Sequence, residues 1–335
     1  MAQKTYGIDF GTGTIKIYKK GKGIILSERN VVSTIGKENK PIAIGETAYE
    51  MYEKEPPSIH VSFPLSHGVI AHMKDMIALW DYMNMTLSGK KKIKGCEYYL
   101  AVPADITDVK KKAYSQIISE GETKPKRVFL VDKPVANVYG LGINLEKARG
   151  ILLVDVGADT TEITVLSLGG IVVTRLLPYG GNDLDNTIRN YIRKEYNFLI
   201  GNRTAEQVKK ELVAAVPMDK MMQVVGRDML RGLPGEIVLT SAQISPLVAQ
   251  FFDDIAVQVR SMLEHTPPEI STDIRERGIY LTGGSSRIQG LSRLIEQETA
   301  VRVNLAAKPQ ETAVSGLGYL SEHSKIASKY VTLMK

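Results

Sequence analysis

Cysteine is almost missing from this chain of 335 residues, which has Cys96 as its single cysteine. One thiol can build neither a disulfide framework nor a thiolate metal site. No apolar run approaches the roughly 18 residues that a membrane span requires. The first residues have neither the apolar core nor the cleavage site of a secretory signal. We therefore expect a protein of a reducing cytoplasm, without a spanning helix.

A strong charge of one sign is also missing, because 43 basic residues face 37 acidic ones and leave a net charge of +6. Nucleic-acid binding would predict clustered Lys and Arg with interleaved aromatic residues, so we expect no nucleic-acid partner. Apolar residues make up 43% of the chain and charged residues 24%, which is typical of folded globular proteins. At about 150 residues per domain, the length favours two domains.

An internal repeat is present in the sequence. The stretches Ile8–Thr14 and Val154–Thr161 each contain an apolar run that ends in aspartate, followed by a glycine turn with hydroxyl side chains. An alternating run and a third apolar run follow in both copies, as expected for strands. Because Asp9 and Asp155 are 146 positions apart, the repeat predicts two similar domains.

Helical periodicity separates the predicted strands, and strands interleaved with helices favour an α/β fold. The expected helices are one capped by Thr107 with Val109, Ala113 and Ile117 on one face; one after Gly180-Gly181 capped by Asn182 or Asp183; one over residues 205–215 with a capping box of Thr204 and Gln207; and one opened by Ser245-Pro246 and ended by Pro267-Pro268.

The two aspartate–glycine turns have the composition of a metal and phosphate site. An aspartate at a strand end can hold hydrated Mg²⁺, which uses one or two carboxylates together with substrate phosphates. Glycines let backbone N–H groups approach phosphate oxygens, and Thr12, Thr14, Thr160 and Thr161 add hydroxyl donors. One such turn alone is more typical of an ordinary hairpin, whereas two matching turns favour a phosphate site.

A third glycine turn, Gly283-Gly284-Ser285-Ser286, follows a predicted strand. It fits a flat ligand or a phosphate at a helix N-terminus, and it fits equally a loop that needs positive φ. The chain lacks the GxxxxGK[ST] motif, which excludes a P-loop NTPase, and it lacks a GxGxxG between strand and helix, so dinucleotide binding is not supported.

The motifs of this chain, taken in order along the sequence, resemble those of the superfamily of actins, heat-shock chaperones and sugar kinases. Within that superfamily they resemble the MreB family of bacterial actins. The resemblance spans nearly the whole chain and implies an α/β, actin-like (ribonuclease H-like) fold with two similar domains flanking a nucleotide cleft. The segments that carry it are IDFGTGT (Ile8–Thr14), VPADITDVKKKA (Val102–Ala113), VDKPVANVYG (Val131–Gly140), VDVGADTTE (Val154–Glu162), YLTGGSS (Tyr280–Ser286) and ETAVSGLGYL (Glu311–Leu320).

The resemblance also implies boundaries and site residues. Domain I would comprise residues 1–141 and 312–335 with an insert at about 33–66, and domain II residues 142–311 with an insert at about 182–245. The implied ligands are ATP or ADP and Mg²⁺. Asp9 and Asp155 would hold Mg²⁺ through water. Asp155, Thr161 and Lys133 take the catalytic positions. The implied nucleotide contacts are Thr12, Gly13, Thr14, Ile15, Gly157, Ala158, Asp159, Thr160, Glu206, Lys209, Lys210, Gly283, Gly284, Ser285 and Ser286. Without the resemblance, Glu206 and Lys209 would be interpreted as a solvated ion pair.

Two positions depart from the family pattern. Relatives have a glutamate before the proline that corresponds to Pro134, and it is thought to orient or activate the attacking water; this chain has Lys133. A charged lysine has no acceptor, so we expect slow hydrolysis. Ala158 and Asp159 replace two glycines of the second turn, and we expect backbone strain there. Lys133 and Asp159 either form a compensating pair or result from drift after loss of selection.

A basic stretch follows two apolar residues in the segment before residue 95. Met85 and Leu87 precede four lysines, Lys90, Lys91, Lys92 and Lys94. In MreB relatives the corresponding region includes a hydrophobic loop that inserts into membrane, so an anionic membrane surface is an expected partner. The alternative is a solvated basic loop ahead of a strand over Glu97–Val102.

The resemblance therefore implies an ATP-binding protein that polymerises with itself into filaments beneath the cell membrane and governs cell shape or movement. Two alternatives stay open. One is a nearly non-hydrolysing structural partner that co-assembles with a more active MreB-like paralogue. The other is a small-molecule kinase on the same fold, which would need a catalytic aspartate poised on a substrate hydroxyl.

Overall fold

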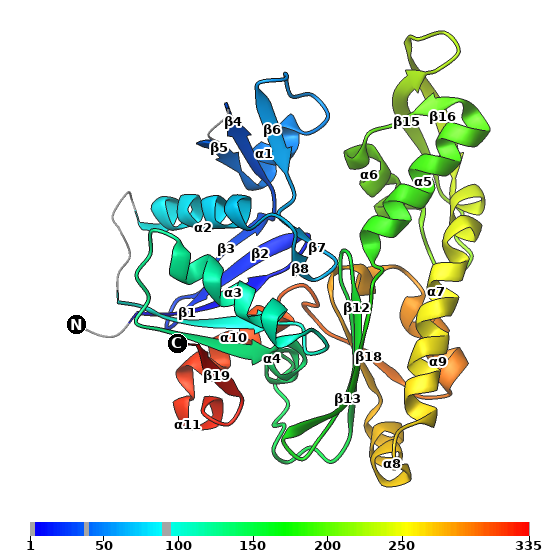
Figure 1. Cartoon of the computed structure of the whole chain (residues 1–335). Helices are drawn as coiled ribbons and strands as arrows, with labels where there is room; N and C mark the ends of the chain where they lie inside the picture. Colours follow the sequence, from blue (N-terminus) through cyan, green and yellow to red (C-terminus); the bar gives the residue numbers. More distant parts are fainter. Residues whose placement is uncertain (1–3, 37–39, 89–94, 335) are drawn as a thin grey trace. The chain divides into compact units, whose positions relative to one another are not determined.

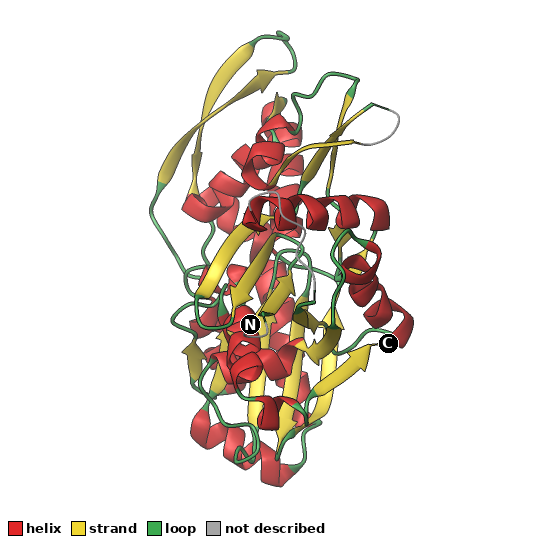
Figure 2. Cartoon of the chain, turned by 90° about the vertical axis from the view of Figure 1, so that its left-hand side faces the viewer, coloured by secondary structure: helices red, strands yellow, loops and turns green. Residues whose placement is uncertain are grey.

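The computed structural model describes residues 4–36, 40–88 and 95–334, and the chain forms two compact units. The first comprises residues 1–148, 168–176 and 310–335, and the second residues 149–167 and 177–309. Helices and strands alternate along both units (Figures 1 and 2), which confirms the predicted α/β class. Within the described ranges, no helix is both long and apolar enough to cross a membrane.

A six-stranded sheet with the order β19-β10-β9-β1-β2-β3 forms the centre of the first unit. Strand β1 is parallel to β9 and antiparallel to β2. Every residue of β1 and β9 is buried, so both faces of the sheet are covered. The six strands are β1 (Thr5–Phe10), β2 (Thr14–Lys19), β3 (Gly23–Arg29), β9 (Glu97–Val102), β10 (Arg127–Asp132) and β19 (Val331–Met334).

Two pairs of helices belong to this sheet. Helix α2 (Met73–Ser88) packs against α3 (Asp108–Glu120), and α4 (Lys133–Gly140) packs against α10 (Thr312–Glu322), which also contacts β1 and β2 (Figure 1). Helices α4 and α10 cross very closely. A Cβ atom added to Gly316 would lie 1.7 Å from the carbonyl oxygen of Ala136. The crossing therefore requires glycine at this position.

Smaller elements complete the first unit. A sheet with the order β5-β4-β6 packs with α1 around a small apolar cluster that contains Val31, Ala48 and Val61. The elements are β4 (Val32–Ile35), β5 (Lys40–Ile44), α1 (Gly45–Met51), β6 (Ile59–Ser62), β7 (Leu65–Ser66), β8 (Val69–Ile70), α11 (Ser324–Ala327) and most of β13 (Gly170–Leu177). Residues 168–176 belong here because Leu168 and Gly169 donate backbone hydrogen bonds to Ala148 and Leu145.

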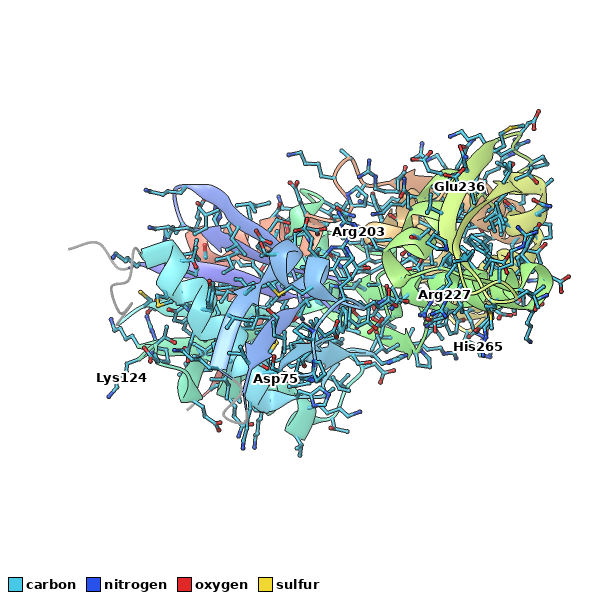
Figure 3. The ribbon with its side chains drawn as sticks, turned by 90° about the horizontal axis from the view of Figure 1, so that it is seen from above. Asp75, Lys124, Arg203, Arg227, Glu236 and His265 are labelled. Carbon is cyan, nitrogen blue, oxygen red and sulfur yellow. The ribbon has the colours of Figure 1, made fainter. Side chains whose placement is uncertain are left out.

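The second unit contains a sheet in which β12, β11, β17 and β18 are successive neighbours, and one large apolar core joins this sheet to its helices. The hairpin of β15 and β16, which carries Arg227 and Glu236, extends the unit (Figures 1 and 3). The elements are β11 (Ile151–Val156), β12 (Thr161–Ser167), α5 (Gly181–Tyr196), β14 (Phe198–Leu199), α6 (Asn202–Leu212), β15 (Met221–Asp228), β16 (Pro234–Thr240), α7 (Ser241–Glu264), α8 (Pro268–Arg277), β17 (Ile279–Thr282), the 3₁₀ turn η1 (Gly284–Arg287), α9 (Leu291–Thr299) and β18 (Val303–Leu305).

The strand register confirms the internal repeat. The β1–β2 hairpin closes with Phe10 opposite Ile15, and the β11–β12 hairpin closes with Val156 opposite Thr161. The two closing pairs are 146 positions apart, which is the spacing of the two aspartates. The expected third strands are present as β3 and β13. The same hairpin is therefore built once in each unit.

The predicted cap of α3 is confirmed, but one residue of its predicted apolar face is misplaced. Thr107 accepts a hydrogen bond from the backbone N–H of Lys110 at 3.4 Å. Val109 is 78% exposed, whereas Ile117 is fully buried. The buried face of the helix begins only at Tyr114, because the first turn, over residues 107–110, is exposed to solvent.

Two predicted helix starts are wrong. Helix α6 begins at Asn202 and ends at Leu212, so Thr204 lies inside its first turn and does not open it. Helix α7 begins at Ser241, where Gln243 accepts from the backbone N–H of Thr240 at 2.9 Å. Pro246 is therefore an interior residue of α7 and not its first. A proline fits the first turn of a helix best. The predicted start of this helix was wrong because it relied on that preference.

The apolar residues before the basic stretch lie in a helix and not in a loop. Met83 and Met85 both belong to α2. Met83 is fully buried and Met85 is 47% exposed, while Leu87 packs against the core of the first unit. Lys90, Lys91, Lys92 and Lys94 lie outside the described residues. The strand expected after them is confirmed as β9.

Candidate functional site

A buried asparagine, Asn30, stabilises the first glycine turn through hydrogen bonds. The side-chain amide of Asn30 donates to the Gly11 carbonyl at 3.0 Å, and its backbone N–H donates to the Gly13 carbonyl at 3.3 Å. A Cβ atom on Gly11 would lie 2.6 Å from the Thr14 carbonyl oxygen. The side chain of Ile15 is fully buried, so only its backbone is available to a ligand.

Lys16, which the sequence analysis missed, belongs to this turn. It lies directly opposite Asp9 across the β1–β2 pair, and both residues are 6% exposed. Its ammonium donates to the Thr14 hydroxyl. Because cross-strand partners project from the same face of a sheet, the hairpin brings a carboxylate, an ammonium and a hydroxyl together.

The second glycine turn is not strained. Among the described residues, the non-glycine residues with positive φ are Glu53, His67, Leu168, Asn197 and Ala300. Ala158 and Asp159 are absent from this set, so the expected strain is wrong. The turn keeps to conformations that any residue adopts. Space rather than φ requires glycine at Gly157, where a Cβ atom would lie 2.9 Å from the Thr160 carbonyl oxygen.

The N-terminus of α5 is docked onto this second turn. Gly181 and Asn182 donate backbone hydrogen bonds to the carbonyls of Gly157 and Ala158, at 3.1 and 2.7 Å. The Asn182 side chain donates to Asp159 at 2.6 Å, so a hydrogen bond within the second unit stabilises this buried carboxylate.

The N-cap of α5 differs from both predicted candidates. Gly180 occupies the cap position, and its backbone N–H donates to the side chain of Asp183 at 2.8 Å. A Cβ atom on Gly180 would lie 2.6 Å from the Ala158 carbonyl oxygen. The close approach of the helix to the turn thus selects glycine as the cap, while Asp183 acts from inside the first turn.

The third glycine turn, Gly283-Gly284-Ser285-Ser286, joins the same network. Gly283 has a φ of +90°, which confirms that the loop needs positive φ, and a Cβ atom there would lie 2.4 Å from a carboxylate oxygen of Asp155. The Ser285 hydroxyl donates to the Gly157 carbonyl at 2.8 Å. Ser286 is buried and donates to the Gly283 carbonyl at 2.6 Å. The loop is therefore tied to the second turn.

Lys209 lies beside this loop and has a partner that the sequence analysis missed. Its ammonium donates to Asp185 at 2.7 Å and to the Gly181 carbonyl at 2.8 Å. The Lys209 side chain is only 12% exposed, so the interpretation as a solvated ion pair is wrong. Glu206 instead forms an ion pair with Lys210 at 2.8 Å. Asp185 lies on the apolar stripe of α5, three residues before Ile188. This position was the sequence signal from which its burial could have been predicted.

Thr161 and Lys133 are the remaining predicted catalytic positions. Thr161 is fully buried, and its hydroxyl donates to the Tyr179 carbonyl at 3.1 Å. Lys133 is the first residue of α4, where the helix dipole disfavours a cation. The neighbouring Asp132 accepts from Lys111 at 2.7 Å. The pairing of Lys133 with Asp159 stays a prediction.

The residues around Asp9 and Asp155 fit Mg²⁺ held mainly by phosphate and water. Asp155 is 4% exposed and lies opposite the equally buried Glu162, which occupies the position that Lys16 has in the first copy. Within the described ranges, no group of three or more His, Cys, Asp or Glu side chains is placed to hold a metal ion. One or two carboxylates are what Mg²⁺ takes from a protein when phosphates supply further ligands.

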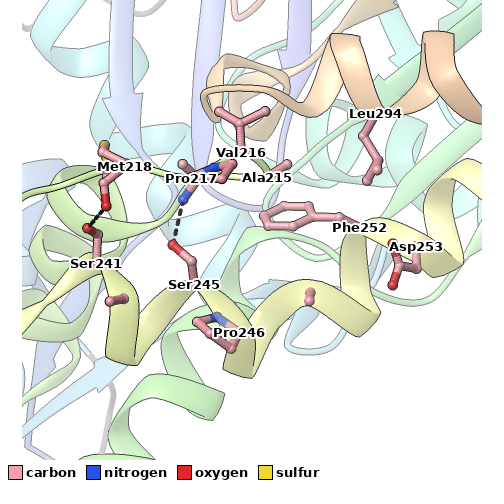
Figure 4. A pocket seen from close by; sticks show the side chains of 13 residues that line it. Ala215, Val216, Pro217, Met218, Ser241, Ser245, Pro246, Phe252, Asp253 and Leu294 are labelled. Atoms are coloured by element: carbon pink, nitrogen blue, oxygen red, sulfur yellow. Dashed lines mark hydrogen bonds between the residues drawn. The ribbon is translucent and has the colours of Figure 1, made fainter.

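A separate cavity of about 350 Å³ lies in the second unit, beside the first turns of α7 (Figure 4). Phe252, Leu294 and Val216 line it with apolar surface, and Asp253 lies at its wall. The hydroxyls of Ser241 and Ser245 bond to neighbouring backbone groups. The cavity contains none of the predicted site residues.

The structure thus brings many of the predicted residues into one cluster in each unit. In the first, Asp9 and the turn over residues 12–15 lie together with Lys16. In the second, the turn over residues 157–161, Lys209 and the loop over residues 283–286 form one hydrogen-bonded network. Each cluster contains one buried carboxylate at a strand end, and the second also contains the buried ammonium of Lys209.

Comparison with known proteins finds that this chain is similar to MreB and Mbl proteins. The family model described as MreB/Mbl protein matches residues 3–329. The cell shape-determining protein Mbl of Bacillus subtilis is 33% identical over 96% of this chain and 97% of its own length. MreB of Escherichia coli is 33% identical over 95% of this chain and 93% of its own.

Solved structures agree with the sequence relatives. MreB5 of Spiroplasma citri bound to ADP has a TM-score of 0.90 at 30% identity, covering 98% of this chain and 99% of that one. The same protein bound to AMPPNP has a TM-score of 0.89. The MamK double helical filament, at 20% identity and a TM-score of 0.77, shares the actin-like fold. The chain belongs to the MreB/Mbl family.

Proposed function

We propose that this chain binds ATP or ADP with Mg²⁺ and polymerises with itself into cytoskeletal filaments that govern cell shape or movement. The observation that carries the proposal is the paired hairpin, built in both units with one register and one carboxylate position. The MreB5 relative was solved with ADP and with AMPPNP, and the curated relatives are cell shape-determining proteins. Family membership argues against the small-molecule kinase.

Each cluster would have a distinct task. The turns after Asp9 and Asp155 would offer backbone N–H groups and threonine hydroxyls to phosphate oxygens. Lys209 has two of its three ammonium hydrogens engaged and would donate the third to the nucleoside, beside Gly283 and Ser285. Mg²⁺, when bound, would neutralise phosphate charge and orient the phosphates.

Hydrolysis at this site is expected to be slow because Lys133 occupies the position of the family glutamate. A charged ammonium cannot accept a proton from water. Positioning and charge stabilisation remain, and these carry much of phosphoryl transfer. We therefore propose long-lived filaments, either alone or together with a more active paralogue. Filaments that depolymerise within minutes in ATP would contradict this.

Nucleotide-dependent sedimentation tests the assembly. With Mg-ATP, the chain is expected to pellet above a critical concentration, and without nucleotide it is expected to stay in the supernatant. The matched loss-of-binding variant is Gly283→Ala, whose added Cβ atom would meet Asp155 and disturb the loop. Equal pelleting with and without nucleotide would contradict the proposal.

Replacing Lys16 with methionine is expected to weaken ATP binding by about tenfold, because a hydrogen bond from a charged group contributes about 1.5–3 kcal/mol. Binding of adenosine, which has no phosphate, should hardly change. Isothermal titration of both ligands measures the difference. Lys19→Met on the same strand is the control, since Lys19 lies over the Tyr6 ring. An equal loss for adenosine would refute a phosphate contact.

Membrane contact rests on fewer residues than the sequence predicts. Of the two apolar residues, Met85 is 47% exposed, while Leu87 packs on the core. We propose that Met85 and the four lysines after it contact an anionic leaflet from the cytoplasmic side, each lysine contributing about 1 kcal/mol. Pelleting with liposomes should then require anionic lipid, and binding to neutral liposomes alone would contradict it.

A further inference from the structure

The pair formed by Asp185 and Lys209 is buried beside the proposed nucleoside site. The two side chains are 10% and 12% exposed, and 2.7 Å separates the carboxylate oxygen from the ammonium nitrogen. Lys209 comes from α6 and Asp185 from α5, so the pair joins two helices. A buried pair of this kind fixes the position of a long, flexible lysine side chain.

Asp185 is placed to hold Lys209 and does little else. Its second carboxylate oxygen is buried and has no hydrogen-bond partner among the residues that the structure describes. The Lys209 ammonium also donates to the Gly181 carbonyl, and a Cβ atom on Gly181 would lie 2.4 Å from the Ser285 hydroxyl oxygen. Asp185 thereby holds the ammonium at the point where the second turn, α5 and the loop over residues 283–286 meet.

We propose that Asp185 is a positioning residue for nucleotide binding, and that mild acid weakens binding by breaking its pair with Lys209. The inference rests on the proposed function of this site. Asp185 contacts no nucleotide atom in this account and acts through Lys209, whose third ammonium hydrogen is the one offered to the ligand.

The charges around Asp185 set the sign of the effect. Burial raises the pKa of Asp185 to about 6, against the lowering effect of Lys209. Glu206 raises this pKa further and Lys210 lowers it, both from α6. The carboxylate is therefore ionised and paired at pH 7.5, and it becomes neutral as the pH falls through about 6. Once neutral, it no longer holds the ammonium, and Glu206, three residues before Lys209 on α6, competes as an anion for it.

The test is the affinity for ADP between pH 7.5 and pH 5.0 in the natural chain and in Asp185→Asn. Because the terminal phosphate of the ligand itself titrates near pH 6, the informative quantity is the ratio of the two affinities. We expect the variant to bind about tenfold more weakly at pH 7.5. We expect the ratio to approach one at pH 5.0, where the natural chain has also lost the charge.

Two further variants separate positioning from general stability. Asp185→Glu keeps the charge and is expected to keep the pH dependence, with affinity between the other two proteins. Asp253→Asn changes the same charge at an exposed site on α7 with no role in the network, and it should behave like the natural chain. Thermal unfolding of each variant at pH 7.5 shows whether the fold is intact. If Asp185→Asn unfolds, the deciding measurement is the pH dependence of ADP affinity in Asp185→Glu, compared with that of the natural chain.

Three outcomes would overturn the inference. A ratio that is tenfold at every pH would mean a structural role without a titration. Equal affinity of the natural chain and Asp185→Asn at pH 7.5 would mean that Lys209 needs no positioning. Absence of ADP binding by the natural chain at all pH values would overturn the proposed function itself and this inference with it, which distinguishes that failure from the other two.

Discussion

Replacing Lys133 with glutamate is expected to raise the rate of phosphate release from Mg-ATP by about a hundredfold or more. A positioned general base typically contributes 10²–10⁴-fold, and the resemblance implies that Lys133 stands where relatives have such a carboxylate. Glutamate also suits the first residue of α4, where the helix dipole favours an anion. Phosphate release under assembly conditions, with both proteins at equal nucleotide occupancy, measures the effect.

A double variant tests whether Asp159 and Lys133 form a compensating pair. If Lys133 and Asp159 compensate each other, the double variant Lys133→Glu with Asp159→Gly should hydrolyse faster than Lys133→Glu alone. Asp159→Gly also removes the acceptor of the Asn182 side chain, so the single variant Asp159→Gly must be run beside it. No additional gain in the double variant would end the pairing hypothesis. Brisk release by the natural chain would show that another group orients the water.

Replacing Gly316 with alanine is expected to destabilise the first unit by about 3 kcal/mol or more. The added Cβ atom would lie 1.7 Å from the Ala136 carbonyl oxygen and 2.9 Å from the Gly140 backbone nitrogen. Both are backbone atoms, so no rotamer change relieves the clash, and α4 must move away from α10. Overpacking of well-packed cores typically costs 1–3 kcal/mol, occasionally more. Thermal unfolding should show an apparent Tm lower by several degrees.

Ser315→Ala provides the matched control for that experiment. Ser315 neighbours Gly316 on α10 and is half-buried, and the substitution adds no atom. Alanine also has a higher helix propensity than serine, so unchanged or slightly raised stability is expected. If Gly316→Ala unfolds at the same temperature as Ser315→Ala, the close crossing of α4 and α10 is not a constraint on the fold.

The repeat could be predicted from the sequence because each of its parts leaves a local signal. Alternating runs, a terminal aspartate and a glycine turn fixed both hairpins, and the register at Ile15 and Thr161 confirmed them. The cap of α3 was visible for the same reason, since Thr107 stands directly before the helical pattern. Features that depend on neighbours within one element are the ones that a sequence reveals.

Features that depend on distant segments were missed or misplaced. Pro246 resembles a first helical residue, but a capping interaction of Thr240 with Gln243 starts α7 earlier. The strain predicted at Ala158 fails because the path of the turn, fixed by its contacts with α5, needs no positive φ there.

The charged residues that complete the site were the hardest to predict. Lys16 and Asp185 are single charges in ordinary-looking segments, and only their burial marks them. A weak signal existed for Asp185, which falls on the apolar stripe of α5. Lys16 alternates with two buried isoleucines, a pattern that predicts a solvent-facing lysine and gave no sign of its burial. A charge on an apolar stripe indicates burial. Such a position predicts a buried charge but not its partner, because the partner comes from another element.

Equilibrium titration of the natural chain with ATP, in the presence and absence of Mg²⁺, tests the central claim most directly. We expect one nucleotide to bind per chain, more tightly with Mg²⁺. We expect Gly181→Ala to weaken this binding, because its Cβ atom would lie 2.4 Å from the Ser285 hydroxyl oxygen. Binding that is absent, or that is unchanged in Gly181→Ala, would contradict the assignment of the paired hairpins and their network as a nucleotide site.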